Sequence, residues 1–141
     1  MSHIAKIELE INDLDALKAA CRRLGLEFRC GQSVYEWYGE YQGDYPLPEG
    51  ISVQDLGQCD HAIHVPGADY EVGVLKRGSK YLLLWDFWEE GGLERVLGRN
   101  AGRLKQAYAI ERTRREALHK GYRMTESRTQ NGVRLVLTVS G

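Results

Sequence analysis

Short segments with a two-residue hydrophobic period fill much of this chain, and that period most limits what it can fold into. Residues 3–11 (HIAKIELEI) place four apolar side chains on one side, Ala5, Ile7, Leu9 and Ile11, which predicts a half-buried strand. Further strands are predicted at 26–30, 60–66, 70–76 and 81–88. An Asn-Gly pair at 131–132 lies between two alternating runs, a pattern typical of a closing β-hairpin.

Only two segments have helical periodicity. The first covers 12–25, where Asn12 or Asp13 can cap the helix and Gly25 can end it. The second is firm over about 101–120. Few helices among many strands favour an α+β fold with an antiparallel sheet and two helices on one face, and a ferredoxin-like core with added strands is the first choice.

Length and composition predict a single domain spanning 1–141. No apolar run approaches the roughly 20 residues that cross a bilayer, and the opening residues do not form a signal-peptide pattern. Three cysteines without a CxxC motif are typical of a reducing compartment. We therefore expect a cytoplasmic protein with free thiols and no membrane partner.

Charge is divided unevenly along the chain. Residues 1–94 contain 8 Lys/Arg and 17 Asp/Glu, a net charge of 8 − 17 = −9. Residues 95–141 contain 11 Lys/Arg and 3 Asp/Glu, a net charge of 11 − 3 = +8. This asymmetry indicates either an anionic partner for the C-terminal part or two halves that neutralise each other within one domain.

The segment 31–58 breaks the strand pattern with an aromatic-rich irregular excursion. A long loop in a compact domain is often functional, so Tyr35, Trp37, Tyr38 and Tyr41 are candidate binding residues. The alternative is that the excursion only covers one face of the sheet, with tyrosine hydroxyls at the solvent edge.

Residues 57–70 (GQCDHAIHVPGADY) bring together side chains that can bind metal. Strand alternation would put Cys59 and His61 on one side and His64 on the other, which is poor geometry for one ion. A site made of Cys59, His61 and His3 is one hypothesis, and an enzyme that uses Cys59 and His61 with Asp60 as an orienting group is another. Structural or surface histidines are the simpler interpretation.

The second helix is rich in arginine, which can contact phosphates. Arg99, Arg103, Arg112 and Arg115 are the candidates for a nucleic-acid interface, and a solvated helix face with local ion pairs is the alternative. The glycines at 98–102 form neither a P-loop nor a dinucleotide fingerprint. No catalytic residue and no cofactor is predicted.

The whole chain resembles one uncharacterised family. Its opening (MSHIAKIELEINDLDALKAACRRLGLEF), YEVGVLKRG, the WDFW strand, the long helix and the closing hairpin are similar to domain of unknown function twelve-fifty-seven, the hypothetical plastid reading frame thirty-five type. That family occurs in cyanobacteria, algal plastids, other bacteria and phages. The resemblance implies no known catalytic residue. It implies an accessory or adaptor role beside an AAA+ ATPase of the MoxR type.

The sequence therefore favours a non-enzymatic binding or adaptor protein with a protein partner, for which an AAA+ ATPase is one candidate. A nucleic-acid-binding protein that uses the basic second helix is the first alternative. A small enzyme or metal-binding protein that uses Cys59 and His61 is the second. The sequence does not predict an oligomeric state.

Overall fold

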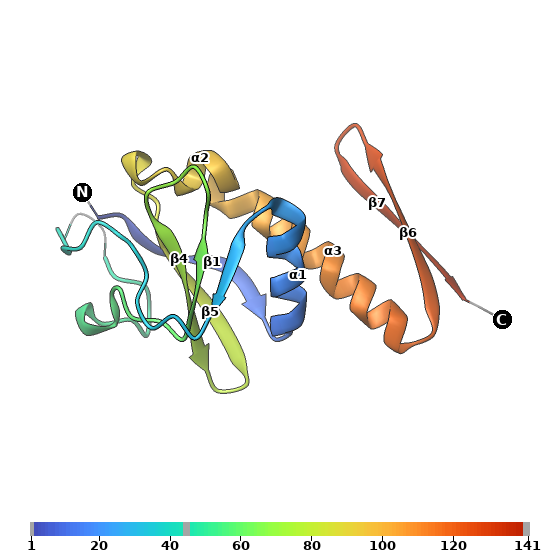
Figure 1. Cartoon of the computed structure of the whole chain (residues 1–141), viewed down its shortest axis with the longest axis horizontal. Helices are drawn as coiled ribbons and strands as arrows, with labels where there is room; N and C mark the ends of the chain where they lie inside the picture. Colours follow the sequence, from blue (N-terminus) through green and yellow to red (C-terminus); the bar gives the residue numbers. More distant parts are fainter. Residues whose placement is uncertain (1, 44–45, 140–141) are drawn as a thin grey trace.

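The structure is a computed structural model, which describes residues 2–43 and 46–139. Tyr45, one of the tyrosines of the excursion, lies outside the described residues. In chain order the helices and strands are β1 (Ile4–Ile11), α1 (Leu14–Leu24), β2 (Glu27–Cys30), β3 (His61–His64), β4 (Glu71–Arg77), β5 (Lys80–Asp86), α2 (Leu93–Leu97), α3 (Gly102–His119), β6 (Tyr122–Thr129) and β7 (Gly132–Val139). Figure 1 shows the sheet of β1–β5 at one end of the molecule and the β6–β7 pair at the other.

The first five strands form one antiparallel sheet in the order β1-β5-β4-β3-β2. This confirms the predicted mixed fold with an antiparallel sheet. The ferredoxin-like core is not confirmed, because α1 connects the two edge strands and three strands lie between them, whereas a split βαβ unit needs only one. The structure also has a third, short helix, α2, in addition to the two predicted helices.

Each face of the sheet packs into its own hydrophobic cluster, because alternate residues of a strand point to opposite faces. The helix-side cluster joins residues of α1, such as Leu17, and of α3, such as Leu104, to one face of the sheet. Its strand residues are Ile7, Ile11, Ile63, Val65, Val72, Val74, Leu83 and Trp85. The excursion-side cluster joins Ile4, Ala62, Leu75 and Leu84 to residues of 31–58. A loop thus takes the place of a helix layer on the second face.

Helix boundaries follow the predicted signals. The Asp13 side chain accepts a hydrogen bond from the Ala16 N–H (3.0 Å) at the start of α1, and Gly25 ends the helix in the left-handed conformation (φ 74°). A kink separates α2 from α3, where Asn100 and Ala101 have φ values of 55° and 57°. Left-handed backbone at two consecutive non-glycine residues is uncommon and interrupts the helix.

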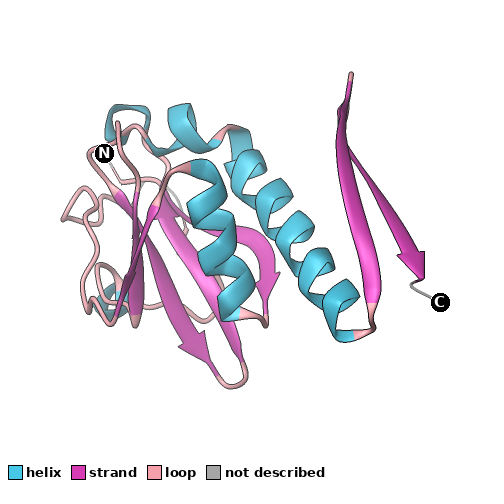
Figure 2. Cartoon of the chain, turned by 45° about the vertical axis from the view of Figure 1, so that its right-hand side comes forward, coloured by secondary structure: helices cyan, strands magenta, loops and turns pink. Residues whose placement is uncertain are grey.

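The β6–β7 pair forms a separate two-stranded ribbon beside α3 (Figure 2). The predicted hairpin is confirmed, but its two turn residues are Gln130 and Asn131, because Thr129 pairs with Gly132. The Asn-Gly prediction was therefore one residue out of register. None of the described ribbon residues is fully buried.

Within residues 2–43 and 46–139, no helix has the length and apolar character that crossing a membrane requires.

Candidate binding cleft

The two faces of the ribbon differ in chemistry. Residues directly opposite each other in an antiparallel pair point to the same face. On the inner face, which we define as the face toward the helices, Tyr122, Met124, Glu126 and Arg128 lie opposite Val139, Leu137, Leu135 and Val133. The outer face carries Arg123, Thr125, Ser127 and Thr129 opposite Thr138, Val136, Arg134 and Gly132. The apolar side chains therefore gather on the inner face.

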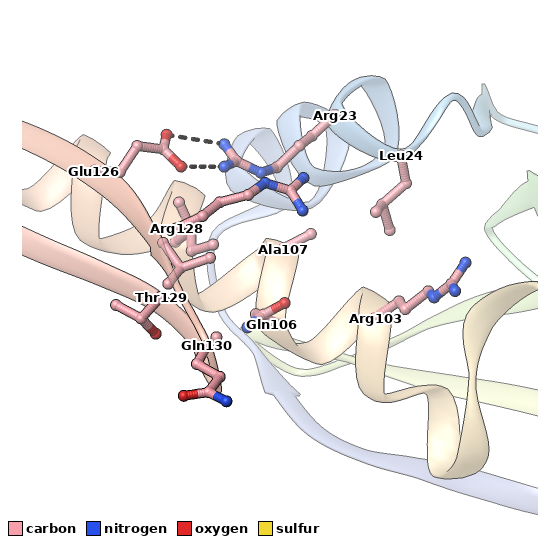
Figure 3. A pocket seen from close by; sticks show the side chains of 12 residues that line it. Arg23, Leu24, Arg103, Gln106, Ala107, Glu126, Arg128, Thr129 and Gln130 are labelled. Atoms are coloured by element: carbon pink, nitrogen blue, oxygen red, sulfur yellow. Dashed lines mark hydrogen bonds and ion pairs between the residues drawn. The ribbon is translucent and has the colours of Figure 1, made fainter.

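This inner face does not pack closely on the rest of the protein. A cleft of about 520 Å³ separates the ribbon from the end of α1 and from one side of α3 (Figure 3). On α3 the lining residues are Arg103, Gln106, Ala107 and Ile110. Steps of three or four positions connect them, so they lie on one side of the helix. Leu137 and Val139, near the α3 end of the ribbon, remain 48% and 69% exposed.

Glu126 connects the ribbon to both helices. Its carboxylate pairs with the guanidinium groups of Arg23 in α1 and Arg114 in α3, and one Arg23 Nη1 to Oε1 distance is 3.1 Å. Arg23 and Arg114 also pair with Glu111, each at 3.4 Å. Hydrogen bonding to Arg23 lowers the pKa of Glu126, so the carboxylate is ionised at neutral pH.

The cleft has an excess of positive charge. Its lining includes three arginines, Arg23, Arg103 and Arg128, and one carboxylate, Glu126, a sum of 3 − 1 = +2. Figure 3 shows the Arg128 side chain extending from the ribbon into the region lined by Arg23 and Glu126. Within the described part of the chain, neither Arg103 nor Arg128 forms an ion pair with a carboxylate. Arg103 instead donates a hydrogen bond to the Val96 carbonyl oxygen at 3.4 Å.

The four arginines predicted as a nucleic-acid interface do not act as one group. Arg115 pairs with Asp13 at 2.8 Å and with Asp15 at 3.5 Å, and Arg112 pairs with Glu116. Arg99 lies on the exposed surface before α3, and only Arg103 lines the cleft. Arg115 thus joins the basic part of the chain to the acidic part, so the two opposite charges partly neutralise each other. A nucleic-acid interface stays a prediction.

The aromatic excursion covers the sheet. Tyr35 is a core residue with 3% exposure, and its ring lies against Gly73, where an added Cβ would approach it to 2.6 Å. Burial raises the pKa of the Tyr35 hydroxyl to about 12. Trp37 and Tyr41 are partly buried in the excursion-side cluster. Tyr38 is 38% exposed and makes an edge-to-face contact with Trp88 (5.3 Å between ring centroids). These packed side chains agree with the covering role.

Two buried carboxylates attach the excursion to the sheet. Asp86 accepts hydrogen bonds from the backbone N–H groups of His3 (2.9 Å), Trp88 (3.1 Å) and Tyr38 (3.2 Å). Glu71 accepts hydrogen bonds from the Glu36 N–H and the Gln32 side chain, both at 3.0 Å. Such hydrogen bonds compensate a carboxylate for the loss of water, so Asp86 and Glu71 have a structural role.

Cys59 and His61 do not share a face, which corrects the sequence-based interpretation. Strand β3 begins only at His61, so the alternation does not extend back to Cys59. The Cys59 thiol donates a hydrogen bond to the Gln32 carbonyl oxygen in the excursion (3.1 Å), whereas the His61 ring contacts Phe28 and Tyr81 of the helix-side cluster. Burial raises the pKa of Cys59 to about 11, which disfavours the nucleophilic thiolate.

The structure does not assemble the predicted metal site of Cys59, His61 and His3. In the described ranges 2–43 and 46–139, no group of three or more His, Cys, Asp or Glu side chains could hold a metal ion. His61 Nδ1 accepts a hydrogen bond from the Gly31 N–H (2.9 Å), and burial lowers the pKa of this imidazole. The His3 ring contacts the Phe87 ring at a tilted angle of 48°, and His64 Nδ1 lies 3.7 Å from a Glu71 carboxylate oxygen.

Sequence reasoning missed most of the cleft. Arg23, Gln106, Glu126 and Arg128 come from three elements, and their proximity depends on tertiary structure. One signal was present in residues 122–128: Glu126 and Arg128 share the alternation phase of Tyr122 and Met124, so charged groups interrupt an otherwise apolar face.

Comparisons with protein-family models, with curated proteins and with solved structures gave no match. The family resemblance therefore stays a prediction.

Proposed function

We propose that this protein acts by binding another protein rather than by catalysis, and that the β6–β7 ribbon is its docking element. One observation carries the proposal: the ribbon stands beside α3 (Figure 2), and the apolar side chains of Leu137 and Val139 are exposed on its inner face. Every strand of the five-stranded sheet, in contrast, contributes to a hydrophobic cluster or packs against one.

The ribbon is less stable than the rest of the fold, and a bound partner would stabilise it. A two-stranded ribbon is at best marginally stable by itself in water. Its unpaired strand edges can accept a further strand, and its exposed apolar side chains gain free energy when another surface covers them. An adaptor role explains why the chain retains such an element. A MoxR-type AAA+ ATPase is the first partner to test, because the family resemblance implies one, and we propose that binding takes place in the cytoplasm.

The proposal is tested with the double substitution Leu137→Ser/Val139→Ser in the full-length protein. Tagged wild-type protein is cross-linked in cell extract, and the captured proteins are identified and their affinities measured with purified components. Burying a leucine or valine side chain contributes about 1.5–3 kcal/mol, so we expect the double variant to bind its partner at least about tenfold more weakly.

Val53→Ser is the matched control, because Val53 is 53% exposed on the excursion, in a different part of the fold. It should leave capture unchanged. The proposal fails if the ribbon variant captures the same proteins with the same affinity as this control, provided that both variants have the circular dichroism spectrum of the wild type.

A further inference from the structure

We infer that the cleft between the ribbon and helices α1 and α3 binds an extended acidic segment of a protein partner. This inference rests on the proposed function and specifies the chemistry that the ribbon and its cleft recognise. A cleft of about 520 Å³ lies within the range of volumes that hold small ligands or a few residues of a chain.

Charge is the first argument for an acidic ligand. The lining carries a net charge of +2, and the guanidinium groups of Arg103 and Arg128 have no carboxylate partner within the described residues. Figure 3 shows the side chains of Arg128 from the ribbon and Arg23 from α1 among those that line the cleft. Like charges in one cleft repel, and an anion bound near Arg103 or Arg128 would offset the excess of positive charge.

Glu126 already shows how a carboxylate binds in this cleft. The two terminal nitrogens of Arg23 each contact one of its oxygens, the bidentate geometry that guanidinium groups favour with carboxylates. Arg128 carries the same group on the same inner face of the ribbon. A glutamate or aspartate of the partner can therefore pair with Arg128 or Arg103 in the way that Glu126 pairs with Arg23.

The remaining lining favours a peptide over a nucleic acid. Leu24 and Val133 are partly exposed and supply apolar surface for aliphatic side chains of a ligand, over a floor formed by the buried Ala107 and Ile110. Gln106 and Gln130 supply amide groups that can hydrogen-bond to a peptide backbone. No aromatic side chain is among the described lining residues, and single-stranded nucleic acids depend on aromatic side chains for base stacking.

The inference is tested by fluorescence polarisation with a labelled peptide of alternating glutamate and leucine. A labelled oligothymidylate and a labelled peptide of alternating lysine and leucine are titrated in parallel. We expect the acidic peptide to bind wild-type protein in preference to the other probes. Arg103→Gln/Arg128→Gln should weaken that binding at least about tenfold, because charge-assisted hydrogen bonds are lost. Arg99→Gln/Arg112→Gln removes the same charge elsewhere and should have no effect.

Charge reversal gives a gain of binding that a merely damaged protein would not show. Arg103→Glu/Arg128→Glu should lose the acidic peptide and bind the lysine–leucine peptide instead. The inference is overturned if the acidic peptide does not bind, if the cleft and control variants bind it equally, or if oligothymidylate is the tighter ligand. A dimer of the wild type that only the cleft variant disrupts would identify a second copy of the chain as the occupant, and would also overturn it.

The two proposals fail in different ways. If Arg103→Gln/Arg128→Gln keeps full affinity for the captured partner while Leu137→Ser/Val139→Ser loses it, the ribbon is a docking element and the acidic-segment inference is wrong. If neither the ribbon variant nor the cleft variant changes capture of any protein, the proposed function itself is wrong.

Discussion

Asp86 connects three separate parts of the chain through backbone hydrogen bonds. The carboxylate is fully buried at the end of β5 and accepts from the N–H groups of His3, Tyr38 and Trp88. One side chain thus fixes the start of β1 and the aromatic excursion relative to the central sheet. An anionic acceptor with two oxygens satisfies these donors better than any neutral side chain of the same size.

We expect Asp86→Asn to lower the free energy of unfolding by about 1–3 kcal/mol, because the new NH₂ group cannot accept a hydrogen bond and leaves at least one buried N–H unpaired. Urea denaturation followed by circular dichroism measures the change. Asp69→Asn is the control, since Asp69 is exposed and a few residues before β4. Equal stability of the two variants would show that Asp86 does not hold the excursion.

At the scale of a single element, the attachment of the ribbon to the helices depends on Glu126. Glu126 is the only acidic residue in 122–139, and it pairs with arginines from both long helices. Hydrogen bonding to Arg23 lowers the pKa of this carboxylate. A lowered pKa in the folded state means that the ion pair stabilises the attached ribbon above the ordinary glutamate pKa of about 4.3, and that this stabilisation is lost as pH falls through the lowered value.

We expect acidification from pH 5 to below the lowered Glu126 pKa to perturb the NMR resonances of β6 and β7 in the wild type. Glu126→Gln should show this perturbed state already at neutral pH. Amide protection in the ribbon should fall roughly two- to fivefold, which corresponds to the free energy that a partly exposed ion pair contributes. Glu116→Gln removes another partner of an α3 arginine, and it should leave the ribbon unchanged. Ribbon resonances of Glu126→Gln that match the wild type at pH 7 would exclude this attachment.

Local sequence patterns predicted most helices and strands, whereas the features that depend on non-local pairing could not be predicted. The cap at Asp13, the left-handed Gly25 and the short apolar runs of β4 and β5 are encoded within a few residues each, so these elements could be predicted to within a few residues. The strand order could not, because nothing local indicates that α1 crosses from one sheet edge to the other. The cleft was missed for the same reason, since Arg23 and Arg128 are far apart in sequence.

At the scale of the whole molecule, α3 links two parts that differ in how they are stabilised. Leu104 and Tyr108 pack in the helix-side cluster, and the Tyr108 hydroxyl accepts hydrogen bonds from the N–H groups of Asn12 and Asp13, both at 3.3 Å. Arg103 and Ile110 of the same helix line the cleft beside the ribbon. The sheet and the helices that pack on it therefore have a buried core, whereas the described residues of the ribbon have none.

We expect amide hydrogen exchange to separate these two parts. Amides of β4 and β5, strands that contain the buried Val74 and Leu83, should exchange only through global unfolding. Amides of β6 and β7 should exchange at least about tenfold faster through local opening, because few apolar contacts hold the ribbon. Native-state exchange followed by NMR gives both values. Equal protection in the ribbon and the central sheet would mean that the molecule opens as one cooperative unit.

The position of the ribbon outside the core has a consequence for how such a chain can evolve. Substitutions in β4 or β5 must preserve a packed interior, so most of them are removed by selection for folding. Substitutions in the ribbon are under weaker selection for folding, because none of its described residues is fully buried. New binding preferences can therefore accumulate there by drift, or arrive by exchange of the hairpin between related genes, while the inherited scaffold stays intact.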